Sequence, residues 1–246
     1  MRSLIRLPLC ALLAASVSSC GDSPSGNATN PDAAAVGGST LPTDPSSGGA
    51  CPTGEEPLEE LTKCAEAGDP EAQNYLGVRY ADGVSVPEND KTAVFWYRKA
   101  AEQGHAMAQH NLGLQYSMGE GVDQNFSEAL EWFRKSAEQG APHGQYELGM
   151  AFDLGRGTRE DDAKAVEWYR KAADQGLDIA QKELGVMYQE GTGVSKNLIQ
   201  AFKWYSLAAG QGHEEAKQLR ETLKTALSPA QISEGQALAT EWKPQR

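Results

Sequence analysis

Four histidines are the side chains in this sequence best suited to acid–base chemistry or metal binding. His105 and His213 occupy the same turn between repeats, and the other two such turns hold the apolar residues Ala141 and Leu177. His110 and His143 fall at different places in the pattern, and neither has a cysteine or second histidine at a metal-ligand spacing. We therefore expect no metal ion.

Other catalytic patterns are also missing from the sequence. The acidic run at 160–162 is explained by Asp161 capping a helix, with its neighbours in a solvated first turn. There is no G-x-S-x-G elbow, no phosphate-binding loop and no G-x-G-x-x-G after a strand. We expect no catalytic group, no cofactor and no small-molecule substrate.

Residues 1–19 have the features of an export signal. Arg2 and Arg6 flank the start of a short apolar run that ends in "VSSC" at Cys20 and then breaks into "GDSPSGN". "VSSC" resembles a bacterial lipobox, whose cysteine is lipidated and becomes the first mature residue. That resemblance implies a lipid-anchored protein in the bacterial periplasm, and Gly21 favours the outer membrane. Residues 20–50, with the lipidated Cys20, would form a flexible tether, because their composition buries little apolar surface.

Two cysteines, Cys51 and Cys64, remain after the signal. An exported chain meets an oxidising compartment, where an even pair usually joins. The alternative is that Cys64 is a small buried residue, because it falls 36 positions before Ala100. We expect a disulfide between the two cysteines.

From Asp69 to Gly212 the sequence repeats with a period of 36 residues. Each unit predicts two helices. On the second, Ala93, Trp96 and Tyr97 lie at i, i+3 and i+4 on one face. The recurring positions are the tryptophans 96, 132, 168 and 204, the Leu-Gly pairs at 76, 112, 148 and 184, the Asx N-caps at 89, 125, 161 and 197, and the closing glycines at 104, 140, 176 and 212.

Two finer features follow from the repeat. A glycine inside each first helix, such as Gly77, costs about 1 kcal/mol relative to alanine, so four of them predict a close approach of another helix. On the second helices, Arg98 with Glu102, Arg134 with Glu138 and Arg170 with Asp174 are spaced as i,i+4 ion pairs.

The stretch "NLGLQYSMGEGVDQNFSEALEWFRKSAEQG" resembles the Sel1-like repeat, which is related to tetratricopeptide repeats. This resemblance implies an all-α fold: a right-handed α/α solenoid of four 36-residue repeats with an N-terminal half repeat and a C-terminal capping helix. The domain would span 51–246, with repeats at about 69–104, 105–140, 141–176 and 177–212 and a cap at 214–243. Ser228 and Pro229 suit the N-cap and first position of the closing helix.

A binding surface is expected where residues vary between repeats while the framework is kept. On the first helices, the face opposite Leu76 comprises positions 71, 74, 75, 78 and 82 and their equivalents, and related solenoids place first helices on the concave surface. We call this the first-helix face. Its interface candidates are Asn74, Tyr75, Met107, His110, Asn111, Met118, His143, Tyr146, Glu147 and Lys182. The alternative for each is an ordinary solvated groove.

Charge narrows the class of partner. Removing the signal deletes Arg2 and Arg6, which leaves 20 basic and 34 acidic side chains and a net charge of −14. Nucleic acid and anionic lipid head groups are disfavoured, and a basic protein partner is favoured.

Three hypotheses on function remain. Some lipoproteins of the resembled family are immunity proteins that bind and neutralise type VI secreted effectors such as phospholipases. A structural adaptor in envelope or polysaccharide-export assembly is the second. A weak hydrolase of the β-lactamase-like kind is the third, and the chain lacks the S-x-x-K that it would need.

Overall fold

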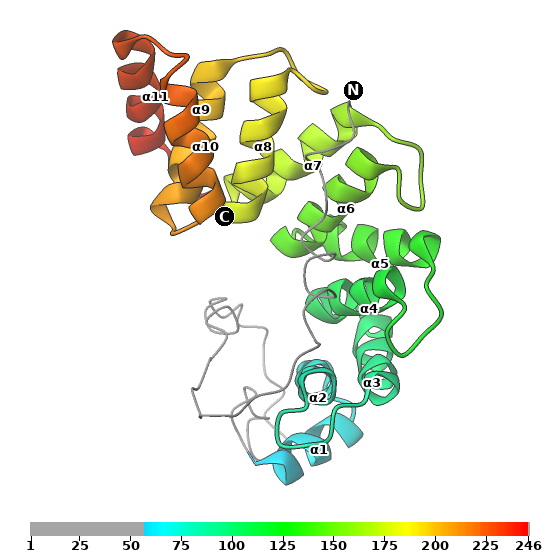
Figure 1. Ribbon diagram of the computed structural model, residues 1–246. Helices are drawn as coiled ribbons and strands as arrows, with labels where there is room; N and C mark the ends of the chain where they lie inside the picture. The colour runs from blue at the N-terminus through cyan, green and yellow to red at the C-terminus, as the bar shows by residue number, and fades with distance from the viewer. Residues whose placement is uncertain (1–56, 246) are drawn as a thin grey trace, which may run out of the picture. The chain divides into compact units, whose positions relative to one another are not determined.

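The computed structural model describes residues 57–245, and within this range the backbone forms helices and loops but no β-strand. Figure 1 shows the helices following one another in chain order from α1 to α11. The first is the N-terminal half repeat, and the next eight form four pairs. Their bounds are α1 Leu58–Glu66, α2 Pro70–Asp82, α3 Asp90–Glu102, α4 Ala106–Met118, α5 Phe126–Glu138, α6 Pro142–Leu154, α7 Asp162–Asp174, α8 Asp178–Glu190, α9 Leu198–Gly210, α10 Glu214–Lys224 and α11 Pro229–Glu241.

The sequence features that lie before residue 57 fall outside the described residues. These are the export signal, the lipidation site Cys20, the tether and Cys51. Among the described helices, none combines the length and the apolar character that a bilayer crossing requires.

The predicted residues at the helix N-termini and C-termini are confirmed. Each of the four Asx residues accepts a hydrogen bond from a backbone N–H in the first turn of its second helix; for Asn89 the donor is Thr92, at 3.1 Å. The four closing glycines have φ between 87° and 101°, a conformation that a residue with a Cβ rarely adopts. Ser228 caps α11 through a capping box with Gln231.

The core runs through the stack as a series of clusters shared between neighbouring helix pairs. From α1 to α10 each helix packs against the next along the chain, and α11 packs against α9, so every first helix touches its own second helix and the second helix before it. The glycines inside the first helices allow this contact. A Cβ atom at Gly77, Gly113, Gly149 or Gly185 would stand 2.5–2.8 Å from the ring of Tyr97, Phe133, Tyr169 or Tyr205, respectively. The predicted close approach is therefore confirmed.

The ion pairs predicted along the second helices are wrong. Among the described residues, none of the three arginines forms a salt bridge with the acidic residue four positions later. Two of the arginines instead donate to a tyrosine hydroxyl on the following first helix. They form this bond in place of an ion pair with an acidic residue on their own helix. The bonds found are Arg98 to Tyr116 at 2.9 Å, Arg170 to Tyr188 at 2.6 Å and Arg134 to Glu131 at 2.6 Å.

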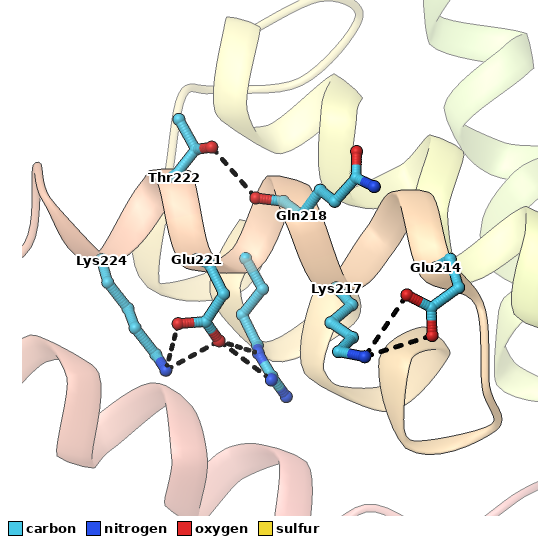
Figure 2. Close-up of polar contacts among 7 residues, drawn as sticks. Glu214, Lys217, Gln218, Glu221, Thr222 and Lys224 are labelled. Carbon is cyan, nitrogen blue, oxygen red and sulfur yellow. Dashed lines mark hydrogen bonds and ion pairs between the residues drawn. The ribbon is translucent and has the colours of Figure 1, made fainter.

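The stack ends at α10, where the repeated Leu-Gly pair is replaced by Arg220 and Glu221. Figure 2 shows the polar side of this helix, on which Glu221 pairs with Lys224 at 2.8 Å and Glu214 pairs with Lys217 at 3.2 Å. Arg220 also contacts Glu221, at 3.0 Å. In the repeats, the Leu-Gly pair forms the apolar surface on which the second helix packs. Arg220 and Glu221 are charged, so α10 has no such surface and the repeat pattern stops here.

Helix α11 and the residues after it close the end of the domain. Gly235 of α11 packs against the ring of Phe202 in α9. Beyond α11, the Trp242 ring lies edge-on to Trp204, with ring centroids 6.4 Å apart. The backbone N–H of Gln245 donates to the carbonyl of Asp174 at 2.7 Å, so the chain end also contacts the third repeat.

Candidate functional site

A ladder of glutamine side chains fixes the first helices that carry the candidate residues. On each first helix a buried glutamine donates to an alanine carbonyl of the preceding second helix and accepts from a second glutamine 30 residues later. The donors to alanine are Gln73, Gln109, Gln145 and Gln181, at 2.9–3.4 Å, and the partners that donate to them are Gln103, Gln139, Gln175 and Gln211, at 2.7–2.9 Å. These buried amides therefore hold each first helix in register with its neighbour.

Two of the four histidines act as helix caps. The Nδ1 atom of His105 accepts from the backbone N–H of Ala108 at 3.1 Å, and that of His213 accepts from Ala216 at 3.3 Å. Asp69 makes the equivalent bond in the first repeat, to Ala72. An accepting Nδ1 requires a neutral ring, and burial lowers the pKa of His105 in the same direction.

The other two histidines meet on the first-helix face. The rings of His110 in α4 and His143 in α6 are 5.6 Å apart, and His110 also lies 6.1 Å from the ring of Phe133. Burial, followed by the nearby His143, lowers the pKa of His110 to about 4. His110 is therefore neutral at physiological pH and forms part of a packed surface.

A polar bridge joins α2 and α4 on the same face. Asn111 donates through Nδ2 to Oδ1 of Asn74 at 3.0 Å, and its Oδ1 lies 3.3 Å from Nδ1 of His110. Asn74 and His110 are buried, and Asn111 is half-buried. Three of the predicted interface residues thus form one hydrogen-bonded group, in which two of them are mostly hidden from solvent.

Aromatic and acidic side chains gather between α6 and α8. The Tyr146 ring lies 5.7 Å from that of Tyr169, and the Tyr169 hydroxyl donates to Asp153 at 3.4 Å. Burial raises the pKa of the Tyr169 phenol well above its usual value, and Glu183 is the largest charge contribution in the same direction. Burial also raises the pKa of Glu147 to about 7, although Arg156 opposes the change.

Lys182 occupies in α8 the position that Tyr146 holds in α6, and it is nearly buried. Its Nζ lies 2.6 Å from Glu183 and 3.4 Å from Glu215 of α10. Burial lowers the pKa of Lys182, but Glu183 and Glu215 outweigh this, so the net change is upward. The lysine is a charged internal link between the fourth repeat and the cap.

The remaining candidates are spread along the face. Tyr75 is half-buried and packs with the cluster around Leu61, and Met107 is half-buried. Met118, at the end of α4, is 39 % exposed. The candidates therefore range from buried to exposed. The side chains that a partner could contact are those of Met118 and of the half-buried Tyr146, Glu147 and His143.

No group of three or more His, Cys, Asp or Glu side chains within the described range is arranged to hold a metal ion. Cys64 lies in α1, half-buried against the cluster that contains Leu61. Because Cys51 lies outside the described residues, the disulfide stays a prediction.

Solved structures resemble the chain over most of its length. A Sel1 repeat protein from Oxalobacter formigenes is 31% identical, with a TM-score of 0.65, and the match covers 76% of this chain and 77% of that one. A protective antigen of uropathogenic Escherichia coli, with an SLR fold, is 29% identical with a TM-score of 0.52, and 75% of this chain matches 47% of that one.

A weaker likeness is to an immunity protein from Pseudomonas aeruginosa, which is 20% identical with a TM-score of 0.48 over 74% of this chain and 72% of that one. That likeness carries no functional weight. No curated protein matches the chain. The family model of the Sel1 repeat matches residues 70–105, 106–140, 142–177 and 178–213. These four matches span more than half of the sequence, and the chain therefore belongs to the Sel1 repeat family.

Proposed function

We propose that this protein acts by binding another protein through its first-helix face. More specifically, we propose that it is a lipid-anchored periplasmic immunity protein that neutralises a toxic secreted effector. The Sel1 repeat is a scaffold for protein interaction, and four copies present a row of first helices on which side chains differ at equivalent places.

One observation carries the proposal. At the position of Asn74 the successive repeats hold His110, Tyr146 and Lys182, whereas the neighbouring glutamines and glycines of the framework do not change. Packing explains the constant positions, because each contacts the preceding or following helix in the same way. Asn74, His110 and Lys182 also contact neighbouring helices, but the fold does not require four different side chains at this position. The accessible Tyr146 is best explained by a specific partner.

Charge supports a basic partner. The sequence has 34 acidic and 22 basic side chains, and those of Arg2 and Arg6 belong to the predicted signal. Opposite charge accelerates encounter and discriminates against acidic competitors.

Site-specific photo-crosslinking in the producing bacterium tests the binding face. A benzoylphenylalanine at Met118 or Tyr146 should crosslink to one defined protein, which mass spectrometry identifies. The matched control is Phe95 on the second helix α3, which is 49 % exposed, and the same probe there should give no adduct with that protein. An adduct from Phe95 alone would contradict the assignment of the face.

A competition assay tests the immunity role. Deleting the gene should sensitise cells to siblings that deliver the crosslinked effector, and purified protein should inhibit that effector at one-to-one stoichiometry. A crosslinked partner without toxicity, together with an envelope defect in the deletion strain, would replace immunity by an adaptor role.

A further inference from the structure

A site with a distinct chemistry lies on the first-helix face where α6, α7 and α8 meet. It consists of Tyr146, Glu147, Tyr169 and Glu183, and we call it the cation site. Figure 1 shows these three helices adjacent to one another in the stack. The rings of Tyr146 and Tyr169 are 5.7 Å apart and tilted by 33°.

Tyr169 reaches this site from a second helix because Gly149 leaves room for its ring. The phenol lies against the backbone of α6, where a Cβ atom at Gly149 would stand 2.8 Å from Cδ1. Its hydroxyl is close enough to Glu183, Asp153 and Glu147 for all three carboxyl groups to raise its pKa. Carboxyl groups of two helices, α6 and α8, therefore act on one phenol of α7.

Glu147 is the carboxyl group of the cation site that has no ion-pair partner within residues 57–245. Within residues 57–245 its carboxyl group forms no hydrogen bond and no ion pair, although surrounding protein atoms raise its pKa to about 7. Arg156 is the basic residue that acts on it electrostatically, and that guanidinium stacks on Phe126, with its Cζ 5.6 Å from the ring centroid.

The next repeat shows what the missing counterpart would be. Glu183 occupies in α8 the place of Glu147 in α6, and the residue before it is Lys182, whose Nζ contacts Glu183 at 2.6 Å. In α6 the residue before the glutamate is Tyr146. The same position thus has an internal cation in the fourth repeat and an aromatic ring in the third.

We propose that the cation site receives a lysine or arginine side chain of the protein partner, which lies against the Tyr146 ring and pairs with the carboxylate of Glu147, as Lys182 pairs with Glu183 in the next repeat. This inference rests on the proposed protein-binding function and specifies the partner's chemistry. Aromatic faces attract cations, and a guanidinium combines stacking with a forked hydrogen bond to a carboxylate. The acidic sequence as a whole favours the same kind of partner.

Nuclear magnetic resonance titration with argininamide tests the site directly on the full mature chain. Citrullinamide is the matched probe, because it has the same length but carries no charge. Argininamide should shift the resonances of Tyr146, Glu147 and Tyr169 in a saturable way, and citrullinamide should not. The Glu147→Gln variant should weaken this binding at least tenfold.

The matched control variant is Glu167→Gln, which removes an exposed carboxylate of α7 and should leave argininamide binding unchanged. The proposal is overturned if argininamide gives no saturable shift, if citrullinamide gives the same shift, or if both variants respond alike.

Photo-crosslinking from Met118 separates this inference from the proposed function. Undiminished partner capture by the Glu147→Gln variant overturns the cation site and leaves the binding function standing. Specific argininamide binding without any partner captured at Met118 or Tyr146 supports the cation site and overturns the proposed function.

Discussion

Gly149 in α6 lies against the phenol ring of Tyr169 in α7, so that a Cβ atom at the glycine would stand 2.8 Å from Cδ1. Gly149→Ala should therefore lower the free energy of unfolding by about 1–3 kcal/mol through overpacking, despite a gain of about 1 kcal/mol in helix propensity. Urea unfolding measures the change. Gly210→Ala is the control, because nothing lies within 4 Å of its Cβ, and it should be neutral or stabilising.

The glutamine ladder predicts unequal effects for its two members. Gln109 is buried, donates to Ala101 at 3.1 Å and accepts from Gln139 at 2.7 Å, whereas Gln139 is exposed. Gln109→Ala should cost about 1–3 kcal/mol because it removes both hydrogen bonds of a buried amide, and Gln139→Ala, which removes one bond of an exposed side chain, should cost about 1 kcal/mol or less. Thermal unfolding of both variants checks the order, and equal losses would show that the ladder is not the cause.

Glu147 predicts a pH-dependent stability. Its folded pKa of about 7 lies above the ordinary 4.5, so the unfolded chain loses the proton first as pH rises. The free energy of unfolding should therefore be largest below about pH 4.5 with respect to this group and fall until about pH 7. The total fall is bounded at about 3 kcal/mol and is reduced by the partial exposure of the side chain.

The Glu147→Gln variant should lack this fall and be more stable than the wild type at pH 8. Urea unfolding at pH 4.5, 6 and 8 compares the two, with Glu167→Gln as a control that keeps the wild-type dependence. Parallel pH profiles for the wild type and Glu147→Gln would contradict an elevated pKa at Glu147.

Cys20 is predicted to carry acyl chains because it ends the lipobox. Metabolic labelling with an alkyne fatty acid should mark the wild type and miss Cys20→Ala. Because several acyl chains hold a protein far better than one, the variant should also leave the membrane fraction. Equal labelling of both proteins would remove the lipid anchor.

A disulfide between Cys51 and Cys64 should appear as one linked peptide pair in unreduced protein from the envelope fraction. Closing so short a loop stabilises by about 3 kcal/mol in the chain-entropy model. Reductant should accordingly lower the unfolding temperature of the wild type but not of Cys51→Ser. Two alkylatable thiols in the native protein would refute the pairing.

The sequence predicted the features that depend on the repeat itself. The Asx caps, the closing glycines and the glycines beneath the aromatic rings each recur at a fixed spacing, and each has one local conformational reason. The glutamines of the ladder recur as regularly, from Gln73 to Gln211, yet their role was missed. The available signal was a polar residue repeated beside the apolar positions of a helix.

Features that depend on contacts between repeats could not be predicted from helical spacing. Arg98 has an acidic residue four positions later but bonds to Tyr116, which lies 18 positions away on the next helix. Phe152 occupies the equivalent place in the third repeat and has no hydroxyl, so Arg134 bonds to Glu131. The burial of His110 likewise depends on Phe133 and His143, which come from other helices.

The charged side of α10 has a consequence for how this protein's length can change. Each repeat contacts mainly the repeats next to it. The charged surface that contains Arg220 and Glu221 therefore stays at the end of the array, whatever number of repeats precedes it. Duplication or loss of one internal unit would alter the number of first helices by one and leave both termini of the stack intact. The recognition surface is thus modular, with a unit of 36 residues.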